Sequence, residues 1–423
     1  MNNVVKNFKT TREMKDSKIE WIGEIPKEWK LPLLGAHFKE RSEKVSDKEY
    51  KPLSVTKQGI VPQLENVAKT DNNDNRKKIC INDFVINSRS DRKGSSGLSK
   101  YEGSTSNISI VLELRDIFPM YAHYLLRSYG FVEEFYRWGN GIVEDLWSTR
   151  YSSMKKINIP FPPFHEQQAI ANYLDEKVGK IDNLIAEQKI ALEKWKEYKE
   201  SLITETVTKG LHSDDSKTWK MYKLGDLGKY KKGPFGSSLK ISMFVEKGDK
   251  TFKVYEQKNA IKKDATIGEA YITLEDFENL KSFEVKEKDI IVSCAGTIGE
   301  CYVLPEKIEK GIINQALMKV TVDDSLEKDY FVKLLQVSLK ELSKEFGNGS
   351  AIKNIPPFSV LKKHKVLVPS INRQKEILLF LDEKCSKIDQ TIEQKQVLIQ
   401  QLEEYKQSLI YECVTGKIEV RER

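Results

Sequence analysis

Two stretches of the chain, residues 171–202 and 378–409, repeat apolar side chains at the a and d positions of a heptad. The first stretch places Ala171, Leu174, Val178, Ile181, Ile185, Gln188, Leu192, Trp195, Lys199 and Leu202 there. The second places Leu378, Leu381, Cys385, Ile388, Ile392, Lys395, Ile399, Leu402, Lys406 and Leu409 there. Proline is absent from residues 164–233 and after residue 369. The pattern predicts two long helices packed as a coiled coil, in which Gln188 faces Lys395 if the helices run antiparallel.

The two stretches belong to an internal repeat with an offset of 207 residues. Residues 162–208 align with residues 369–415 without a gap, and about 20 of the 47 positions are identical. Fainter echoes lie upstream, such as DFVINS at 83–88 and DIIVS at 289–293. The repeat predicts four segments: a first variable block (1–160), a central helix (161–210), a second variable block (211–367), and a C-terminal helix and tail (368–423).

The variable blocks have mixed signals. Short apolar runs at 83–88, 110–114, 289–293 and 317–322 predict strands, whereas residues 120–139 and 329–347 have helical spacing. We therefore predict an α+β fold of two mixed α/β domains separated by the long helices, with pseudo-two-fold internal symmetry.

Composition narrows the class of protein. The chain has 423 residues, of which 31% are charged, and no run approaches the ~18 apolar residues of a membrane span. The N-terminus lacks the apolar core of a secretory signal, and the five cysteines are scattered, which favours a reducing cytoplasm. The four segments have net charges of +6, −2, +4 and −1. Basic blocks favour a polyanionic partner, although a solvated lysine-rich surface is the alternative.

Motifs for catalysis are missing. The sequence has no GxGxxG dinucleotide loop and no GxxxxGK[ST] phosphate loop, and its five histidines lie far apart. We therefore expect no catalytic residue, no metal and no bound cofactor in this chain.

Three loops carry donors that suit DNA. Arginine can read guanine with two hydrogen bonds, and hydroxyl groups bind phosphates. The candidate DNA-binding residues are Asn87, Arg89, Arg92, Lys93, Ser95, Ser96, Lys231, Lys232, Ser237, Ser238, Lys240 and Thr297. Plain surface turns are the alternative. The first variable block contains nine arginines, whereas residues 211–365 contain none. This contrast predicts that the two blocks read different half-sites of the DNA.

The segment that is most similar between the two repeats is rich in charged residues of both signs. LDEKVGKID (174–182) recurs as LDEKCSKID (381–389). Its acids either form solvated pairs along the helix or contact a partner that is bound twice. The candidate partner-binding residues are Asp175, Glu176, Asp182, Asp382, Glu383 and Asp389.

The repeat plan resembles the specificity subunit of type I restriction–modification enzymes. The resemblance also rests on IEWIGEIPKEWK (19–30), IPFPPFHEQQAIANYLDEK (159–177) and DIIVSCAGTIG (289–299); NRQK (372–375) departs from the usual Glu-Gln. It implies two target recognition domains on double-stranded DNA and two spacer helices, packed as an antiparallel coiled coil, that dock two modification subunits. S-adenosylmethionine would be bound by those subunits, and ATP with magnesium by restriction subunits. A coiled-coil scaffold or a silent specificity cassette is the alternative.

Overall fold

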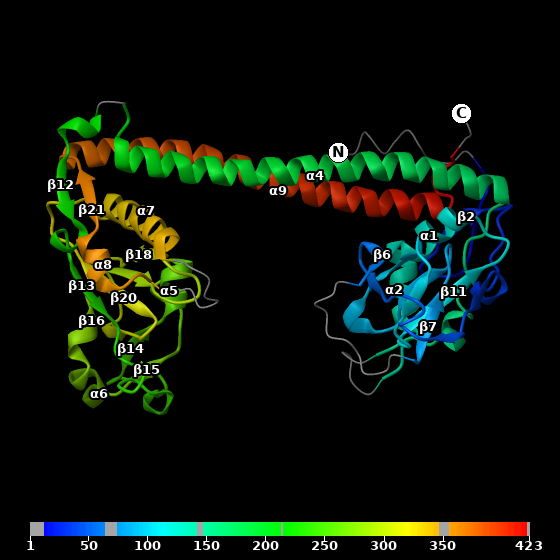
Figure 1. Cartoon of the computed structure of the whole chain (residues 1–423), viewed down its shortest axis with the longest axis horizontal. Coiled ribbons are helices and arrows are strands. Elements are labelled where there is room, and N and C mark those ends of the chain that lie inside the picture. The colour runs from blue at the N-terminus through cyan, green and yellow to red at the C-terminus, as the bar shows by residue number, and fades with distance from the viewer. Residues whose placement is uncertain (1–11, 64–73, 142–146, 213–214, 347–354, 421–423) are drawn as a thin grey trace. The chain divides into compact units, whose positions relative to one another are not determined.

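The computed structural model describes residues 12–63, 74–141, 147–212, 215–346 and 355–420 (Figure 1). The chain forms two compact units. The first unit comprises Met1–Ile190 with Lys395–Arg423, and the second comprises Ala191–Gln394. Each unit contains one sheet-rich domain and parts of two long helices. Each is described by itself.

The long helices are α4 (Phe164–Lys209) and α9 (Ile371–Val414). In the first unit, the beginning of α4 packs against the end of α9, and in the second the end of α4 packs against the beginning of α9. The helices are therefore antiparallel in both units, as predicted. Lys395 Nζ donates a hydrogen bond of 2.9 Å to Gln188 Oε1, so the two polar seam residues face each other. Residues 188 and 395 are related by the repeat offset.

The domain of the first unit is built mainly from antiparallel strands. Two sheets have the orders β3-β11-β8-β9 and β10-β7-β4, beside the hairpins β1-β2 and β5-β6. Its strands are β1 (Met14–Asp16), β2 (Glu24–Pro26), β3 (Phe38–Glu40), β4 (Lys44–Val45), β5 (Leu53–Thr56), β6 (Gly59–Pro62), β7 (Arg76–Ile79), β8 (Phe84–Asn87), β9 (Ser96–Leu98), β10 (Gly103–Thr105) and β11 (Ser109–Leu114). Its short helices are α1 (Pro119–Arg127), α2 (Tyr129–Arg137) and α3 (Tyr151–Met154). The core joins Phe131 and Tyr121 to Leu174 of α4 and Leu409 of α9.

The domain of the second unit repeats one of these sheets. Its order β13-β20-β17-β18 has the same central antiparallel pairing as β3-β11-β8-β9, and a second sheet has the order β15-β14-β19-β16, beside the pair β12-β21. Its strands are β12 (Lys220–Lys223), β13 (Lys229–Lys232), β14 (Phe252–Tyr255), β15 (Tyr271–Ile272), β16 (Glu284–Val285), β17 (Ile290–Ser293), β18 (Cys301–Val303), β19 (Gly311–Ile313), β20 (Leu317–Thr321) and β21 (Lys365–Val368). Its short helices are α5 (Gln257–Lys262), α6 (Leu274–Asn279), α7 (Lys328–Phe346) and α8 (Phe358–Lys363). The echo between DFVINS and DIIVS therefore marks the equivalent strands β8 and β17.

One sequence expectation about helix limits was wrong. Residues 120–139 form two helices, because Ser128 has extended backbone and caps α2 by accepting from Phe131 N. The helix α4 continues to Lys209, and Val207 near its end is fully buried in the core of the second unit.

Each domain is attached to the long helices by the same two contacts. Gln167 and Gln374, in the first turns of α4 and α9, are buried. Their Nε2 groups donate to Pro162 O and Pro369 O, and their Oε1 atoms accept from Phe118 N and Glu327 N, all at 2.8 to 2.9 Å. At the other contact, Tyr121 OH donates to Val414 O at 3.2 Å and Tyr330 OH to Val207 O at 3.0 Å. Val207 and Val414 are again 207 residues apart, so the attachment follows the repeat.

The pair of hydrogen bonds made by the side chain of Gln167, here called the glutamine clamp, gives a testable expectation. Gln167→Ala leaves the Phe118 amide and the Pro162 carbonyl without their partner, which costs about 2 to 3 kcal/mol for two unmade bonds at a largely buried site. We expect faster amide hydrogen exchange at the start of α1, measured by mass spectrometry. Gln168→Ala, at the exposed neighbouring position, is the matched control. Equal exchange in both variants would contradict the clamp.

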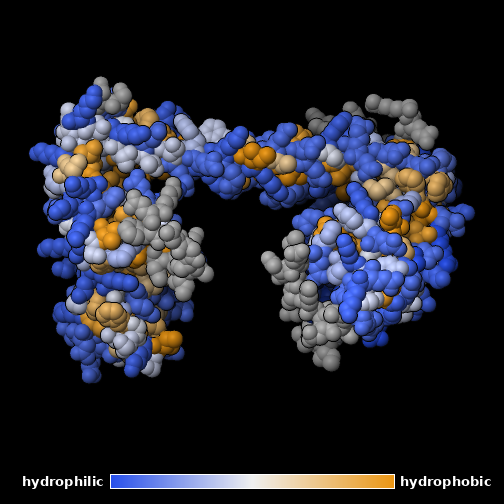
Figure 2. All heavy atoms as spheres, in the orientation of Figure 1, coloured by the Kyte–Doolittle hydropathy of each residue, from blue (hydrophilic) through white to orange (hydrophobic). Residues whose placement is uncertain are grey.

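The surface of each unit in the view of Figure 2 is mostly hydrophilic, with smaller patches of hydrophobic residues. Among the residues that the structure describes, no helix is long and apolar enough to cross a membrane.

Candidate nucleic-acid interface

The loop after β8 holds the first group of predicted DNA-binding residues. Asn87 ends β8, and residues 90–92 form a short 3-10 helix in which Asp91 lies 3.2 Å from Arg89 and 3.7 Å from Arg92. Lys93 Nζ lies 2.6 Å from Glu133. Ser95 and Ser96 are buried, so Arg89 and Arg92 are the members of this group whose long charged side chains are best placed to reach a ligand. Their role in DNA binding stays a prediction.

A cleft of about 660 Å³ lies beside this loop in the first unit. Backbone hydrogen bonds from Ser90 N to Trp147 O and from Thr149 N to Ser88 O join the loop to the segment before α3. The cleft is lined by Glu40, Lys77, Ser88, Arg89, Asn107, Ile108, Ile110, Ser148, Thr149, Arg150, Tyr151 and Ser152. Its charged lining therefore has three cations and one carboxylate.

The charged side chains of the cleft differ in how firmly hydrogen bonds within the protein hold them. Lys77 Nζ is fixed between Glu40 Oε1 at 2.8 Å and Ser109 O at 2.9 Å. Arg150 is exposed and directly precedes α3. Two arginines with serine hydroxyls around them can contact base edges and phosphates. The arrangement suits a nucleic acid.

Sequence reasoning missed Arg150, Lys77 and Asn107. Arg150 lies about 60 residues from Arg89 in the chain, and only the pairing of residues 88–90 with 147–149 brings them to one cleft. The available signal was compositional, because Arg150 is one of the nine arginines confined to the first block.

The strand β9 behind the loop is supported by a neutral histidine. His123 Nδ1 accepts a hydrogen bond of 3.3 Å from Leu98 N. Burial, reinforced by the nearby Arg127, lowers the pKa of His123 to about 3. The imidazole therefore remains an acceptor at neutral pH and adds no charge to the interface.

The second unit presents lysines and an exposed aromatic side chain instead of arginines. Lys231 and Lys232 lie on β13 and are exposed, and Lys231 Nζ lies 4.7 Å from the centre of the Phe283 ring. Ser237, Ser238 and Lys240 are exposed in the loop after β13. Phe235, which sequence reasoning missed, is 86% exposed in that loop.

Thr297 lies in a different loop, between β17 and β18. It is exposed, and its carbonyl accepts from Ser293 Oγ at 2.6 Å and from Gln257 Nε2 at 3.3 Å. Ser293 itself is buried and supports the loop from inside. The residues predicted to bind DNA in the second unit therefore come from β13 with the loop after it, and from the separate loop between β17 and β18.

Most of the repeated acids hold the protein itself together. Asp175 Oδ1 accepts from Tyr124 OH at 2.6 Å; burial, with this hydrogen bond, raises the pKa of Tyr124. Asp182 pairs with Lys406 at 2.7 Å, and its repeat equivalent Asp389 pairs with Lys199 at 2.6 Å.

The glutamates of the repeated segment pair along their own helices. Glu176 contacts Lys180 and Glu383 contacts Lys387, each at 2.6 Å, while Asp382 is exposed. Their contact with a partner protein stays a prediction. Among the described residues, no group of three or more His, Cys, Asp or Glu side chains could hold a metal ion.

Comparisons with known proteins agree with this architecture. Residues 216–404 match the family model of the type I restriction modification DNA specificity domain. A protein assigned as the type I restriction enzyme MjaX specificity subunit of Methanocaldococcus jannaschii is 24% identical, and the match covers 98% of this chain and 97% of that protein.

Two solved structures share the fold. One is a chain from a study of complex assembly and conformational transition of the type I R-M system, with a TM-score of 0.72, 15% identity, and coverage of 93% of this chain and 99% of that one. The other is the HsdS subunit from Thermoanaerobacter tengcongensis, with a TM-score of 0.54, 16% identity, and coverage of 93% and 98%. Residues 216–404 therefore match the type I restriction modification DNA specificity domain, and over nearly its whole length the chain is similar to specificity subunits of type I restriction–modification systems.

Proposed function

We propose that this chain is a non-catalytic subunit that reads a bipartite, asymmetric DNA target, one half with each domain. In this proposal the long helices set the spacing between the half-sites and dock two modification subunits. One observation carries it: the helices repeat their attachment contacts at an offset of 207 residues, whereas the domains they carry differ in chemistry. Like surfaces suit identical partners, and unlike surfaces suit different DNA sequences.

The proposed division of labour leaves the chemistry to other subunits. The modification subunits would bind S-adenosylmethionine and methylate the DNA, and restriction subunits would use ATP and magnesium. This chain would supply affinity through phosphate contacts and specificity through base contacts. Arg89 and Arg150 are the side chains of the first unit best suited to base edges.

An insertion in α4 tests whether the helices set the spacing. Duplicating residues 204–207 inserts four residues, which lengthens the helix by about 6 Å and rotates the residues beyond the insertion by about 40°. One further base pair rotates DNA by a similar angle, about 34 to 36°. We therefore expect the unspecified gap in the target to grow by one base pair, measured by sequencing methylated DNA from cells that carry the variant and its modification subunit.

A matched insertion separates spacing from general damage. Four residues placed after Gly248, in an exposed turn of the second unit, leave both long helices intact. This control should keep the original gap. An unchanged gap in an active helix variant would count against the helices as the determinant of spacing.

A further inference from the structure

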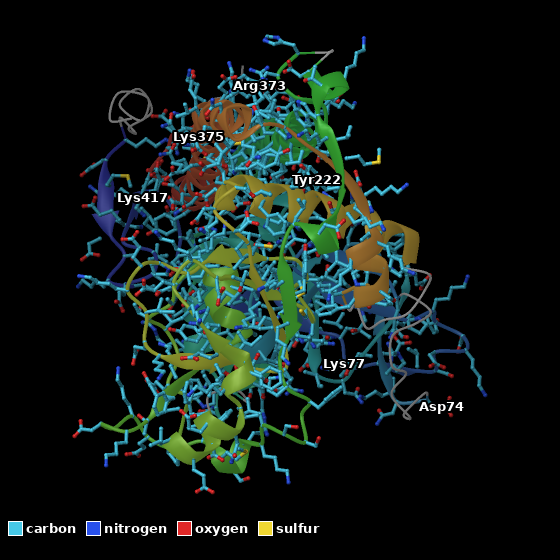
Figure 3. All side chains as sticks on the ribbon, turned by 90° about the vertical axis from the view of Figure 1, so that its left-hand side faces the viewer. Asp74, Lys77, Tyr222, Arg373, Lys375 and Lys417 are labelled. Atoms are coloured by element: carbon cyan, nitrogen blue, oxygen red, sulfur yellow. The ribbon has the colours of Figure 1, made fainter. Side chains whose placement is uncertain are left out.

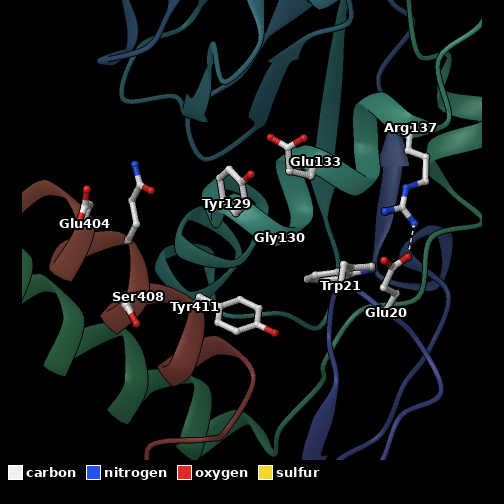
Figure 4. A pocket seen from close by; sticks show the side chains of 10 residues that line it. Glu20, Trp21, Tyr129, Gly130, Glu133, Arg137, Glu404, Ser408 and Tyr411 are labelled. Carbon is white, nitrogen blue, oxygen red and sulfur yellow. Dashed lines mark hydrogen bonds and ion pairs between the residues drawn. The ribbon is translucent and has the colours of Figure 1, made fainter. Parts of the chain in front are cut away.

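Two grooves of similar size occur at equivalent positions of the repeat. The first, about 490 Å³, lies between α9 and α2 and includes Trp21 and Tyr129 in its lining (Figure 4). The second, about 510 Å³, lies between the end of α4 and α7 in the second unit. The α9 lining is Glu404, Gln407, Ser408 and Tyr411. The α4 lining includes Glu197, Glu200, Ser201 and Thr204, which are the same positions minus 207.

Sequence identity between the two helices rises again at these grooves. Between residues 183–196 and 390–403 one of fourteen positions is identical, whereas nine of twelve are identical between 197–208 and 404–415. Packing accounts for the buried members, such as Val207 and Val414. It does not account for Glu197 and Glu404 or for Ser201 and Ser408, because all four are exposed.

Each long helix also carries an exposed tyrosine directly after its groove glutamate in the sequence, although neither tyrosine lines its groove. Tyr198 is 53% exposed and its equivalent Tyr405 is 43% exposed. Tyrosine is enriched in protein–protein interfaces because it combines a large apolar ring with a hydrogen-bonding group. In the first groove, Tyr129 adds a further aromatic ring that is 62% exposed. These aromatic side chains suit a protein segment that supplies apolar side chains.

Charge selects among possible occupants. The first groove is lined by Glu20, Glu133 and Glu404 with Arg137, a net charge of −2. The second is lined by four glutamates, Lys209 and Lys340, also a net charge of −2. The variable blocks as a whole are basic. The grooves are therefore acidic sites on basic domains. Their negative charge repels DNA and attracts a basic segment of protein.

We propose that the two grooves are matching docking sites for one basic, amphipathic segment of a partner protein that binds in two copies, one to each unit. This inference rests on the proposed function, in which that partner is the modification subunit. It moves the expected contact from the LDEK segments, whose acids are largely paired within the chain, to Glu197–Ser201 and Glu404–Ser408.

Charge reversal in each groove tests the proposal. The full chain is co-expressed with its modification subunit, and the number of bound copies is measured by native mass spectrometry. Glu197→Lys and Glu404→Lys should each weaken one copy at least tenfold, as expected for a reversed charge at an interface. Each single variant then binds one copy, and the double variant binds none.

Controls on the same helices keep the outcomes distinct. Glu187→Lys and Glu393→Lys reverse exposed glutamates that line neither groove, and they should bind two copies. Two copies retained by the Glu197→Lys/Glu404→Lys variant, or equal losses in the controls, would overturn the docking proposal. A wild-type chain that binds fewer than two copies would instead overturn the proposed function.

Discussion

Replacing Arg89 and Arg150 together by alanine is expected to remove recognition of one half of the DNA target. Each arginine that makes two hydrogen bonds to a guanine contributes about 1 to 3 kcal/mol of discrimination. The double change should therefore weaken binding of the target by the complex by roughly 100-fold or more. Because both residues line the cleft of the first unit, the bases read by the second domain should stay the same.

The measurement is DNA binding by the complex with modification subunits, using targets with single-base changes across both half-sites. Arg115→Ala is the matched control, because Arg115 is an exposed arginine of the same domain outside the cleft. An equal effect of this control, or a double variant that tolerates base changes in both half-sites, would contradict the expected role of the two arginines. A uniform loss for all DNA sequences would assign them to phosphates instead of bases.

The second large effect is expected at the ion pair between Arg12 and Glu166. Glu166 is buried in the first turn of α4, contacts the Arg12 guanidinium and accepts a 3.1 Å hydrogen bond from Trp29 Nε1. Glu166→Arg places two cations together and leaves the indole donor without its acceptor. Breaking a buried pair of this kind costs about 3 to 5 kcal/mol. We expect a clearly lower melting temperature for the first unit, measured by calorimetry.

The reversed double variant is the decisive control. Arg12→Glu with Glu166→Arg restores opposite charges, so it should recover part of the stability lost by Glu166→Arg alone. Recovery would be partial, because the indole donor still faces a guanidinium and the carboxylate at position 12 lies beside Glu28 and Glu419. A Glu166→Arg variant as stable as the wild-type chain would contradict a stabilising role of the Arg12–Glu166 pair.

The same attachment in the second unit uses the opposite polarity. Arg373, which is labelled in Figure 3, occupies the repeat position of Glu166. It contacts Asp215 and Glu376. The hydrogen bond from Arg373 lowers the pKa of Asp215. The replacement of HEQQ by NRQK therefore reverses the charge at the position of Glu166 and Arg373. Gln374 still accepts the hydrogen bond from Glu327 N.

Local periodicity explains what the sequence could predict. The heptad pattern identifies the long helices and the side chains of their seam, because a and d side chains must meet in a coiled coil. Their antiparallel direction was expected from the resemblance, and it brings Gln188 opposite Lys395. Apolar runs also identify the central strands β8, β11, β17 and β20. The break at Ser128 escapes notice because the apolar spacing continues across it.

Contacts between distant segments explain what the sequence could not predict. Arg150 reaches the cleft only through pairing of residues 147–149 with the loop after β8. Asp182 and Asp389 look like free surface acids until the antiparallel packing brings Lys406 and Lys199 beside them. In each case a tertiary contact decides the role of the residue.

The recognised DNA sequence tests the central claim most directly. Long-read sequencing of methylated bases, in cells that carry this chain and its modification subunit, gives the whole target in one measurement. We predict two short, unlike half-sites separated by a fixed gap of unspecified bases, because one domain has nine arginines and the other has none between residues 211 and 365. A continuous target, or two identical half-sites, would contradict the bipartite reading of DNA by two unlike domains.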